Sequence, residues 1–329
     1  MVGAFLSIVS TVTVADSSAL FAKSARVSTN VINSERIRTL QYFALGDSFA
    51  SGEGNNANNY DPATDPATDP SGMGNSCHRS YDSYAEILNS VSPLIQSLDF
   101  VACSGAKIAD VALLGQHGEA PQISIFGSTP NTTAPRLITL SIGGNDAGFV
   151  PTLQTCATLV DCHLDAATLS TVDLAIASIR ADLEVLYRNI MKDPSNLNQF
   201  TSMIIVGYPR LFGTGDCPVT TPIDMNLLYS ADERAWMDTL AVRLNREIRK
   251  AVDTVATEGH RVYFANVMGT FWGHEACGAL AGPSWINPLD FAEFEHSFHP
   301  NELGHAALAE QLERVLLDRV LFNVRTVGR

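Results

Sequence analysis

The feature that most constrains the fold is the alternation of five short apolar runs with long helical patterns. The runs are QYFAL before Gly46, SLDFVAC around Val101, RLITLSI before Gly143, SMIIVG around Ile205 and RVYFANV around Phe264. Nearly continuous apolar runs indicate strands that are covered on both faces, as in a parallel sheet. Strands that alternate with helices therefore predict an α/β fold with a parallel central sheet and right-handed crossovers.

Helical patterns fill the spaces between these runs. Apolar side chains at helical spacing predict helices over 171–192 and 231–257, and a last helix that begins near Asn301. Two pairs have the spacing of a capping box, which marks the start of a helix: Ser170 with Asp173, and Ser230 with Glu233. We expect residues 40–322 to form a single domain.

Composition narrows the function classes. The 329 residues carry a net charge of -14, and 46% are hydrophobic, as is typical of a globular protein. An acidic surface repels phosphate backbones, so nucleic acid is not an expected partner. Beyond the N-terminus no stretch approaches the roughly 20 apolar residues of a membrane span, so no integral span is expected.

The first 19 residues are apolar and end among small residues, as in a secretory signal peptide. No Lys or Arg precedes the apolar stretch, so a disordered N-terminus or a buried N-terminal element stays an alternative. The sequon at Asn131 agrees with secretion. The acidic repeat DPATDPATDPSG at 61–72 is interpreted as a solvated loop, with cation binding as the weaker alternative.

Six cysteines give a second indication of the compartment. None forms a C-x-x-C pair, which disfavours zinc-ribbon and redox motifs. An even count in an exported chain predicts three disulfides, whereas six free thiols would suit a cytosolic protein. Six cysteines allow about 15 pairings, of which the sequential one is the simplest.

Small polar segments follow the first three predicted strands. GDS with Ser48 follows the first, CSGA with Gly105 the second, and GGND with Asn145 the third, while His299 precedes the last helix. Ligands of an open parallel sheet bind at the carboxyl ends of its strands, so these segments should meet. The set fits acyl transfer, which needs a serine, a histidine base and N–H donors for the oxyanion. Each residue alone could be an ordinary turn residue; the four together favour a hydrolase.

The blocks GDSFASGEG, GGND and HPNELGH, with Gly105 between the first two, resemble those of the SGNH (GDSL-type) hydrolase superfamily. The nearest group is the secreted esterases and lipases with three disulfides. The resemblance implies a flavodoxin-like three-layer α/β/α sandwich with about five strands, and hydrolysis of small-molecule or lipid esters without a cofactor or metal. It also implies the sequential disulfides Cys77–Cys103, Cys156–Cys162 and Cys217–Cys277. We expect a monomer.

By residue, the resemblance makes Ser48 the nucleophile and His299 the general base. The oxyanion hole would consist of the Ser48 N–H, the Gly105 N–H and Asn145. The family usually has Asp three residues before the histidine, and here that residue is His296. The prediction is therefore a Ser48–His299 dyad in which the backbone carbonyl of His296 orients the imidazole. Glu293 and Glu295 are the alternative orienting groups.

Further assignments stay open at this stage. Asp47 is expected to form a structural hydrogen bond, and Tyr208, Leu211 and Phe212 could line an acyl pocket or pack in the core. A metal between His296 and His299 lacks a complete ligand pattern. Rival functions are a carbohydrate O-deacetylase or phospholipase of the same fold, and a catalytically silent secreted binding protein.

Overall fold

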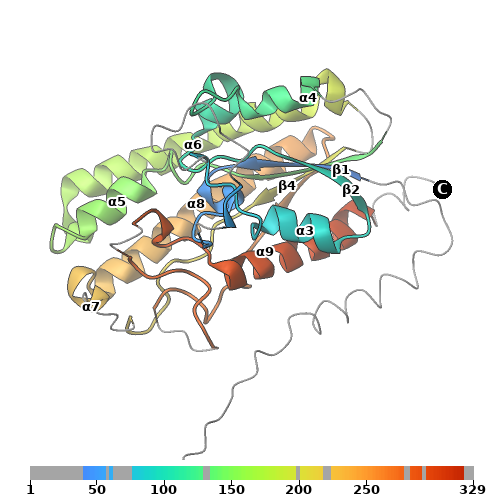
Figure 1. Ribbon diagram of the computed structural model, residues 1–329. Helices are drawn as coiled ribbons and strands as arrows, with labels where there is room; N and C mark the ends of the chain where they lie inside the picture. Colours follow the sequence, from blue (N-terminus) through green and yellow to red (C-terminus); the bar gives the residue numbers. More distant parts are fainter. Residues whose placement is uncertain are drawn as a thin grey trace, which may run out of the picture. The chain divides into compact units, whose positions relative to one another are not determined.

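Five parallel strands form the central sheet of the computed structural model, in the order β2-β1-β3-β4-β5 (Figure 1). They are β1 (Leu40–Gly46), β2 (Ile95–Phe100), β3 (Arg136–Ser141), β4 (Ser202–Val206) and β5 (Val262–Ala265). Each predicted apolar run overlaps one strand, which confirms the expected parallel α/β sheet. The strand order is that of flavodoxin-like doubly wound folds.

The structure describes residues 40–56, 59–61, 76–128, 134–197, 201–217, 224–277, 282–290 and 294–321. The expectations for residues 1–19, for Asn131, for Glu293 and for most of the 61–72 repeat fall outside these ranges.

Helices of several lengths connect the strands. The α-helices of the described residues are α2 (Ser48–Ser51), α3 (Tyr84–Val91), α4 (Ile125–Ser128), α5 (Phe149–Cys156), α6 (Ala166–Lys192), α7 (Met225–Leu228), α8 (Ala231–Thr257) and α9 (Glu302–Val315). Short 3₁₀ or π turns lie at Asp110–Leu114, Gln122–Ser124, Cys162–Leu164, Pro194–Asn196, Phe294–His296 and Leu316–Leu321. No helix in the described ranges is long and apolar enough to cross a membrane.

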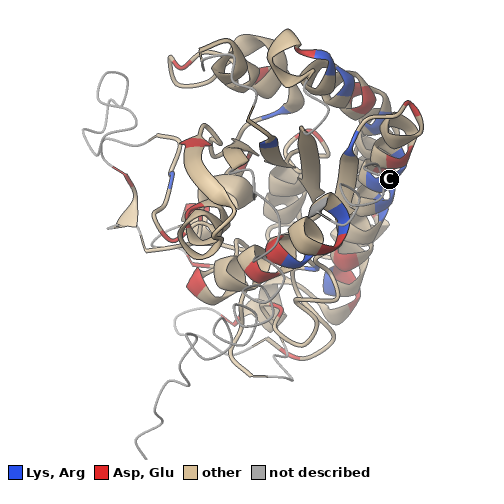
Figure 2. Cartoon of the chain, turned by 90° about the vertical axis from the view of Figure 1, so that its right-hand side faces the viewer, with Lys and Arg blue, Asp and Glu red and all other residues tan. Residues whose placement is uncertain are grey.

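The sheet is the middle of three layers (Figure 1). Along β1, Phe43 and Leu45 pack into the core shared with α6 and α8, whereas Tyr42 and Ala44 pack into the core shared with α3 and α9. Successive strand residues point to opposite faces, and both faces here are covered, so all four are buried. Figure 2 shows charged residues mainly on the outer helices and few on the strands.

Helix α8 begins where its capping box predicts. The Ser230 hydroxyl accepts from the Glu233 N–H at 3.3 Å, and the Glu233 carboxylate accepts from the Ser230 N–H at 2.8 Å. The predicted capping box of the other long helix is wrong. Helix α6 begins earlier, at Ala166, because the Asp165 carboxylate accepts from both the N–H and the hydroxyl of Thr168 at 2.8 Å. Asn301 caps α9 as expected.

Three disulfides join the cysteines in sequential order: Cys77–Cys103, Cys156–Cys162 and Cys217–Cys277. This is the pairing that the family resemblance implied. Their loops differ greatly in length, since the partners are 26, 6 and 60 residues apart in sequence. A cross-link that closes a longer loop removes more conformational entropy from the unfolded chain.

This difference predicts the ranking of two disulfide deletions. Replacing Cys217 and Cys277 by alanine should lower the free energy of unfolding by about 4 kcal/mol, against about 2 kcal/mol for Cys156 and Cys162, in the chain-entropy model. Urea unfolding of both double variants measures the difference. Equal losses would show that loop length does not set the stabilisation in this chain.

Candidate active site

The predicted nucleophile stands where β1 ends. Gly46 has φ 136°, and a Cβ there would lie 2.2 Å from the Ser141 carbonyl oxygen, so only glycine lets β1 approach β3 this closely. The Asp47 carboxylate accepts from the Phe49 N–H at 3.1 Å and caps α2. Ser48 is therefore the first residue of α2, just beyond the carboxyl edge of the sheet.

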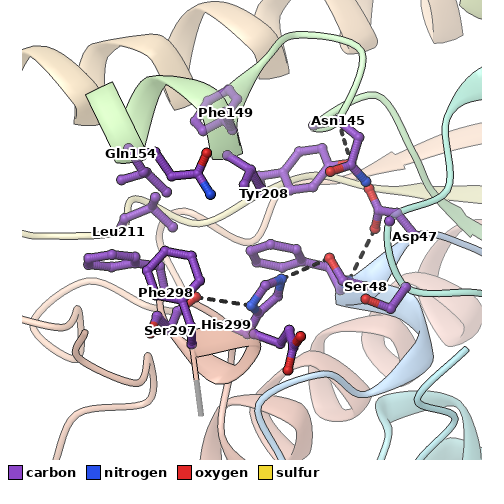
Figure 3. Close-up of a pocket in the computed structure, with 18 of the residues that line it drawn as sticks. Asp47, Ser48, Asn145, Phe149, Gln154, Tyr208, Leu211, Ser297, Phe298 and His299 are labelled. Atoms are coloured by element: carbon purple, nitrogen blue, oxygen red, sulfur yellow. Dashed lines mark hydrogen bonds between the residues drawn. The ribbon is translucent and has the colours of Figure 1, made fainter. Parts of the chain in front are cut away.

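His299 meets Ser48 across 251 residues of sequence. The ring nitrogen Nε2 lies 2.8 Å from the Ser48 hydroxyl oxygen, and Nδ1 lies 3.0 Å from the Ser297 carbonyl oxygen (Figure 3). Because a carbonyl can only accept, Nδ1 carries the proton, and Nε2 is left to accept from the serine hydroxyl. Burial lowers the pKa of His299, which favours this neutral form.

The orienting carbonyl belongs to Ser297 rather than to His296, so that prediction is corrected. The His296 carbonyl instead accepts from the His299 N–H at 3.2 Å and from Asn287 Nδ2 at 3.3 Å. Phe298 has a φ of 61°, which folds the chain back after the turn and presents the carbonyl of residue 297 to the ring. Glu295 lines the pocket, but its carboxylate makes no hydrogen bond to His299 in the described structure.

Three N–H donors border the pocket in front of Ser48. Gly105 and Asn145 line it together with Ser48. The backbone N–H groups of Ser48 and Gly105 have no acceptor within the described ranges. Asn145 Nδ2 donates to the Ala106 carbonyl at 3.0 Å, which fixes the orientation of the amide and leaves its second N–H for another acceptor. The structure thus brings all the sequence-predicted donors to one place.

A buried tyrosine joins the nucleophile segment to the Asn145 segment. The Tyr208 hydroxyl donates to Asp47 and accepts from the Gly144 N–H at 3.0 Å. Burial raises the pKa of Asp47 to about 7, although the hydrogen bonds from Tyr208 and Phe49 oppose the rise. Sequence reasoning expected a structural hydrogen bond from Asp47 but left Tyr208 unassigned, since the link spans 161 residues.

An apolar cavity of about 350 Å³ opens beside the dyad. Its apolar lining comes from α5, from the segment after β4 and from the segment before His299, namely Phe149, Val150, Leu153, Leu211, Phe294 and Phe298. In Figure 3, Phe149, Leu211 and Phe298 lie across the cavity from Asp47. Of the three residues left open, Tyr208 and Leu211 line the cavity, whereas Phe212 packs in the core against Tyr229 and Phe298.

Within the described ranges, one group of acidic, histidine or cysteine side chains is close enough for a shared ion: Cys156, Cys162 and Glu233. Both cysteines are consumed by a disulfide, and Glu233 accepts from the Cys162 N–H at 2.9 Å. This group is therefore structural.

The Tyr208 bridge predicts a loss of stability when its hydroxyl is removed. Tyr208→Phe leaves the Gly144 N–H without a partner and leaves the Asp47 carboxylate with its bond from the Phe49 N–H alone, which should cost about 1–3 kcal/mol. Tyr187→Phe is the matched control, because its buried hydroxyl has no hydrogen-bond partner among the described residues. Chemical unfolding should show a loss for Tyr208→Phe only; equal values would contradict the bridge.

The family model of GDSL-like lipases and acylhydrolases matches residues 44–307. A lipase of Streptomyces rimosus is 30% identical over 289 residues, which cover 88% of this chain and 89% of that protein. Lipase 1 of Streptomyces coelicolor is 29% identical over 266 residues, covering 80% and 82%.

Two solved structures share the fold. The crystal structure of an extracellular lipase from Streptomyces rimosus matches with a TM-score of 0.63 and 28% identity, over 84% of this chain and 99% of that one. A phospholipase A1 from Streptomyces albidoflavus NA297 matches with a TM-score of 0.62 and 27% identity, over the same shares. The chain therefore belongs to the GDSL-like lipase/acylhydrolase family and is an ester hydrolase.

Proposed function

We propose that the protein is a secreted, monomeric carboxylesterase or lipase that forms an acyl-enzyme on Ser48. The observation that carries this proposal is the 2.8 Å contact between His299 Nε2 and the Ser48 hydroxyl, with the ring's other nitrogen fixed by Ser297. The three disulfides and the similarity to an extracellular lipase support secretion.

In the acylation step, Ser48 Oγ attacks the ester carbonyl carbon while its proton passes to His299 Nε2. The carbonyl oxygen gains a negative charge, which the N–H groups of Ser48, Gly105 and Asn145 would stabilise. Collapse of the tetrahedral intermediate breaks the bond to the alcohol oxygen. The His299 imidazolium gives its proton to that leaving alcohol, and the acyl group stays on Ser48.

Deacylation repeats the sequence with water in place of serine. His299 removes a proton from water, the hydroxide attacks the acyl carbon, and the same donors hold the oxyanion. The proton then returns to Ser48 Oγ, which releases the acid. The neutral Nε2 required at both attacks agrees with the burial that lowers the pKa of His299.

The apolar cavity supports an acyl chain longer than acetyl as the preferred substrate group. Its surface is mostly aliphatic and aromatic, although Gln154 and Glu295 also line it. This favours a carboxylesterase or lipase over a carbohydrate O-deacetylase. A phospholipase is the second candidate, because the matched Streptomyces albidoflavus enzyme is a phospholipase A1.

The dyad is tested by removing each member. Ser48→Ala and His299→Ala should each lower kcat on a p-nitrophenyl ester by at least about 10³-fold, as in other serine hydrolases. His260→Ala, outside the pocket, is the control for removing an imidazole. A phosphonate should label the parent protein on Ser48 and leave Ser48→Ala unlabelled. Residual full activity in Ser48→Ala would reject the acyl-enzyme and leave a binding role for the fold.

Acyl length is tested by filling the cavity. Leu153→Trp should lower kcat/KM for octanoyl esters by about tenfold or more while acetyl esters are hydrolysed as before, since a lost apolar subsite discriminates chain length. Leu174→Trp, at a side chain that is 69% exposed on α6, controls for the larger residue. An unchanged octanoyl-to-acetyl ratio would place the acyl chain elsewhere.

A further inference from the structure

The orienting group of His299 is a neutral carbonyl, yet a buried carboxylate, Glu53, lies in the segment that packs against this histidine. The imidazolium that forms during acylation has no carboxylate bonded to it, because Nδ1 meets the Ser297 carbonyl. Glu53 is five residues after Ser48 and is completely buried. A carboxylate in such a place is costly unless its surroundings compensate it.

Side chains from several separate segments, Ser104 among them, compensate Glu53. Its Oε2 lies 2.6 Å from His78 Nδ1, and its Oε1 accepts from the Tyr60 hydroxyl at 3.2 Å. His296 Nε2 is 3.0 Å from that same hydroxyl and 4.0 Å from Glu53 Oε1. Burial raises the pKa of Glu53, but the His78 hydrogen bond and the nearby His299 outweigh it and hold this pKa below its ordinary value. The carboxylate therefore stays ionised.

The backbone packs the Glu53 segment directly against His299. A Cβ added to Gly54, which has φ 94°, would lie 2.8 Å from the His299 Cβ. Asn287 Nδ2 donates to the Gly54 carbonyl at 2.7 Å and to the His296 carbonyl at 3.3 Å, so one amide ties the two segments together. The charge of Glu53 opposes the effect of burial on the pKa of His299.

We propose that Glu53 is a positioning residue whose buried negative charge stabilises the His299 imidazolium during ester hydrolysis. The proposal rests on the Ser48–His299 dyad proposed above. Glu53 takes up no proton in this reaction. The serine proton passes to His299 Nε2 and then to the leaving alcohol, and Glu53 acts through the electric field of its charge. His296 stands at the position where the family usually has Asp, three residues before the catalytic histidine. It lies instead against Glu53, the carboxylate of the GDSFASGEG segment.

Two further ionisable groups near the ring do not duplicate this charge: a charged His296 lowers the pKa of His299 and so opposes Glu53, and burial raises the pKa of Asp47 to about 7, so Asp47 is largely neutral below that pH. Glu53 faces His78, Tyr60, His296 and His299. His299 also faces His305. Burial lowers the pKa of His305 to about 4, so His305 is neutral at the pH values above 4 where His299 titrates. Glu295 borders the pocket with an exposed side chain, where solvent screens its charge.

The pH profile of kcat/KM for a p-nitrophenyl ester tests the proposal, because its acid limb reports the pKa of the histidine base in the free enzyme. Glu53→Gln removes the charge and keeps the shape. Loss of a nearby anion lowers the pKa of the imidazolium, so the acid limb should move to lower pH by about one unit. The plateau value of kcat/KM should fall about tenfold, which corresponds to one pKa unit of lost imidazolium stabilisation.

Glu313→Gln is the matched control. It also removes one carboxylate from a buried glutamate, but Glu313 lies about 16 Å along α9 from Glu302 at its first turn. Its acid limb and plateau should equal those of the parent. A lower kcat/KM in Glu53→Gln with an unchanged acid limb would show that Glu53 has only a structural role, and would overturn the proposal. An equal shift of the acid limb in Glu313→Gln would overturn it as well.

A second variant decides the matter if Glu53→Gln does not fold. His78 is at the surface side of the network, with a side chain that is 28% exposed and a φ of 49° that suits glycine. His78→Gly removes the hydrogen bond that keeps Glu53 ionised, so the acid limb should shift the same way by a smaller amount; no shift overturns the proposal. Turnover by Ser48→Ala would instead reject the dyad itself, whatever Glu53 does.

Discussion

The meeting of three strand ends at one edge of a parallel sheet is the constraint on which the site depends. β1 and β3 lie side by side, and the chain crosses to opposite sides of β1 to reach β2 and β3. The segments that follow these strands must therefore converge in front of the sheet. Gly46 permits the close approach of β1 to Ser141, and this places Ser48 between the Gly105 and Asn145 segments. His299 enters from a fourth segment, fixed by the N-terminal end of α9.

Sequence patterns predicted the strands and helix starts that depend on neighbouring residues in the chain. The five apolar runs identified the strands because burial on both faces requires continuous apolar residues, and the α8 capping box set that helix start to the residue. Local chemistry also explains the error at α6, where two candidate caps lie five residues apart and Asp165 makes the stronger pair of bonds. Propensity alone does not choose between them.

The orienting carbonyl and the Glu53 network depend on contacts that sequence spacing does not encode. Ser297 replaces His296 because Phe298 adopts a left-handed backbone, and such a conformation is rare for phenylalanine. Glu53 carried one signal, a charged residue among the small residues of GDSFASGEG, but two of its partners are 25 and 7 residues away and a third, His296, lies in a distant segment. Only the folded chain shows that this glutamate is buried and that its segment packs against His299.

The Cys77–Cys103 disulfide makes the active site depend on the redox conditions around the protein. Cys77 precedes His78, which holds Glu53, and Cys103 lies two residues before Gly105. One sulfur–sulfur bond therefore clamps the segment that carries the charge network to the segment that offers an N–H to the substrate oxygen. In a reducing compartment the segments of His78 and Gly105 would lose this covalent link. The redox state of the surroundings therefore affects the geometry of the active site as well as the stability of the fold.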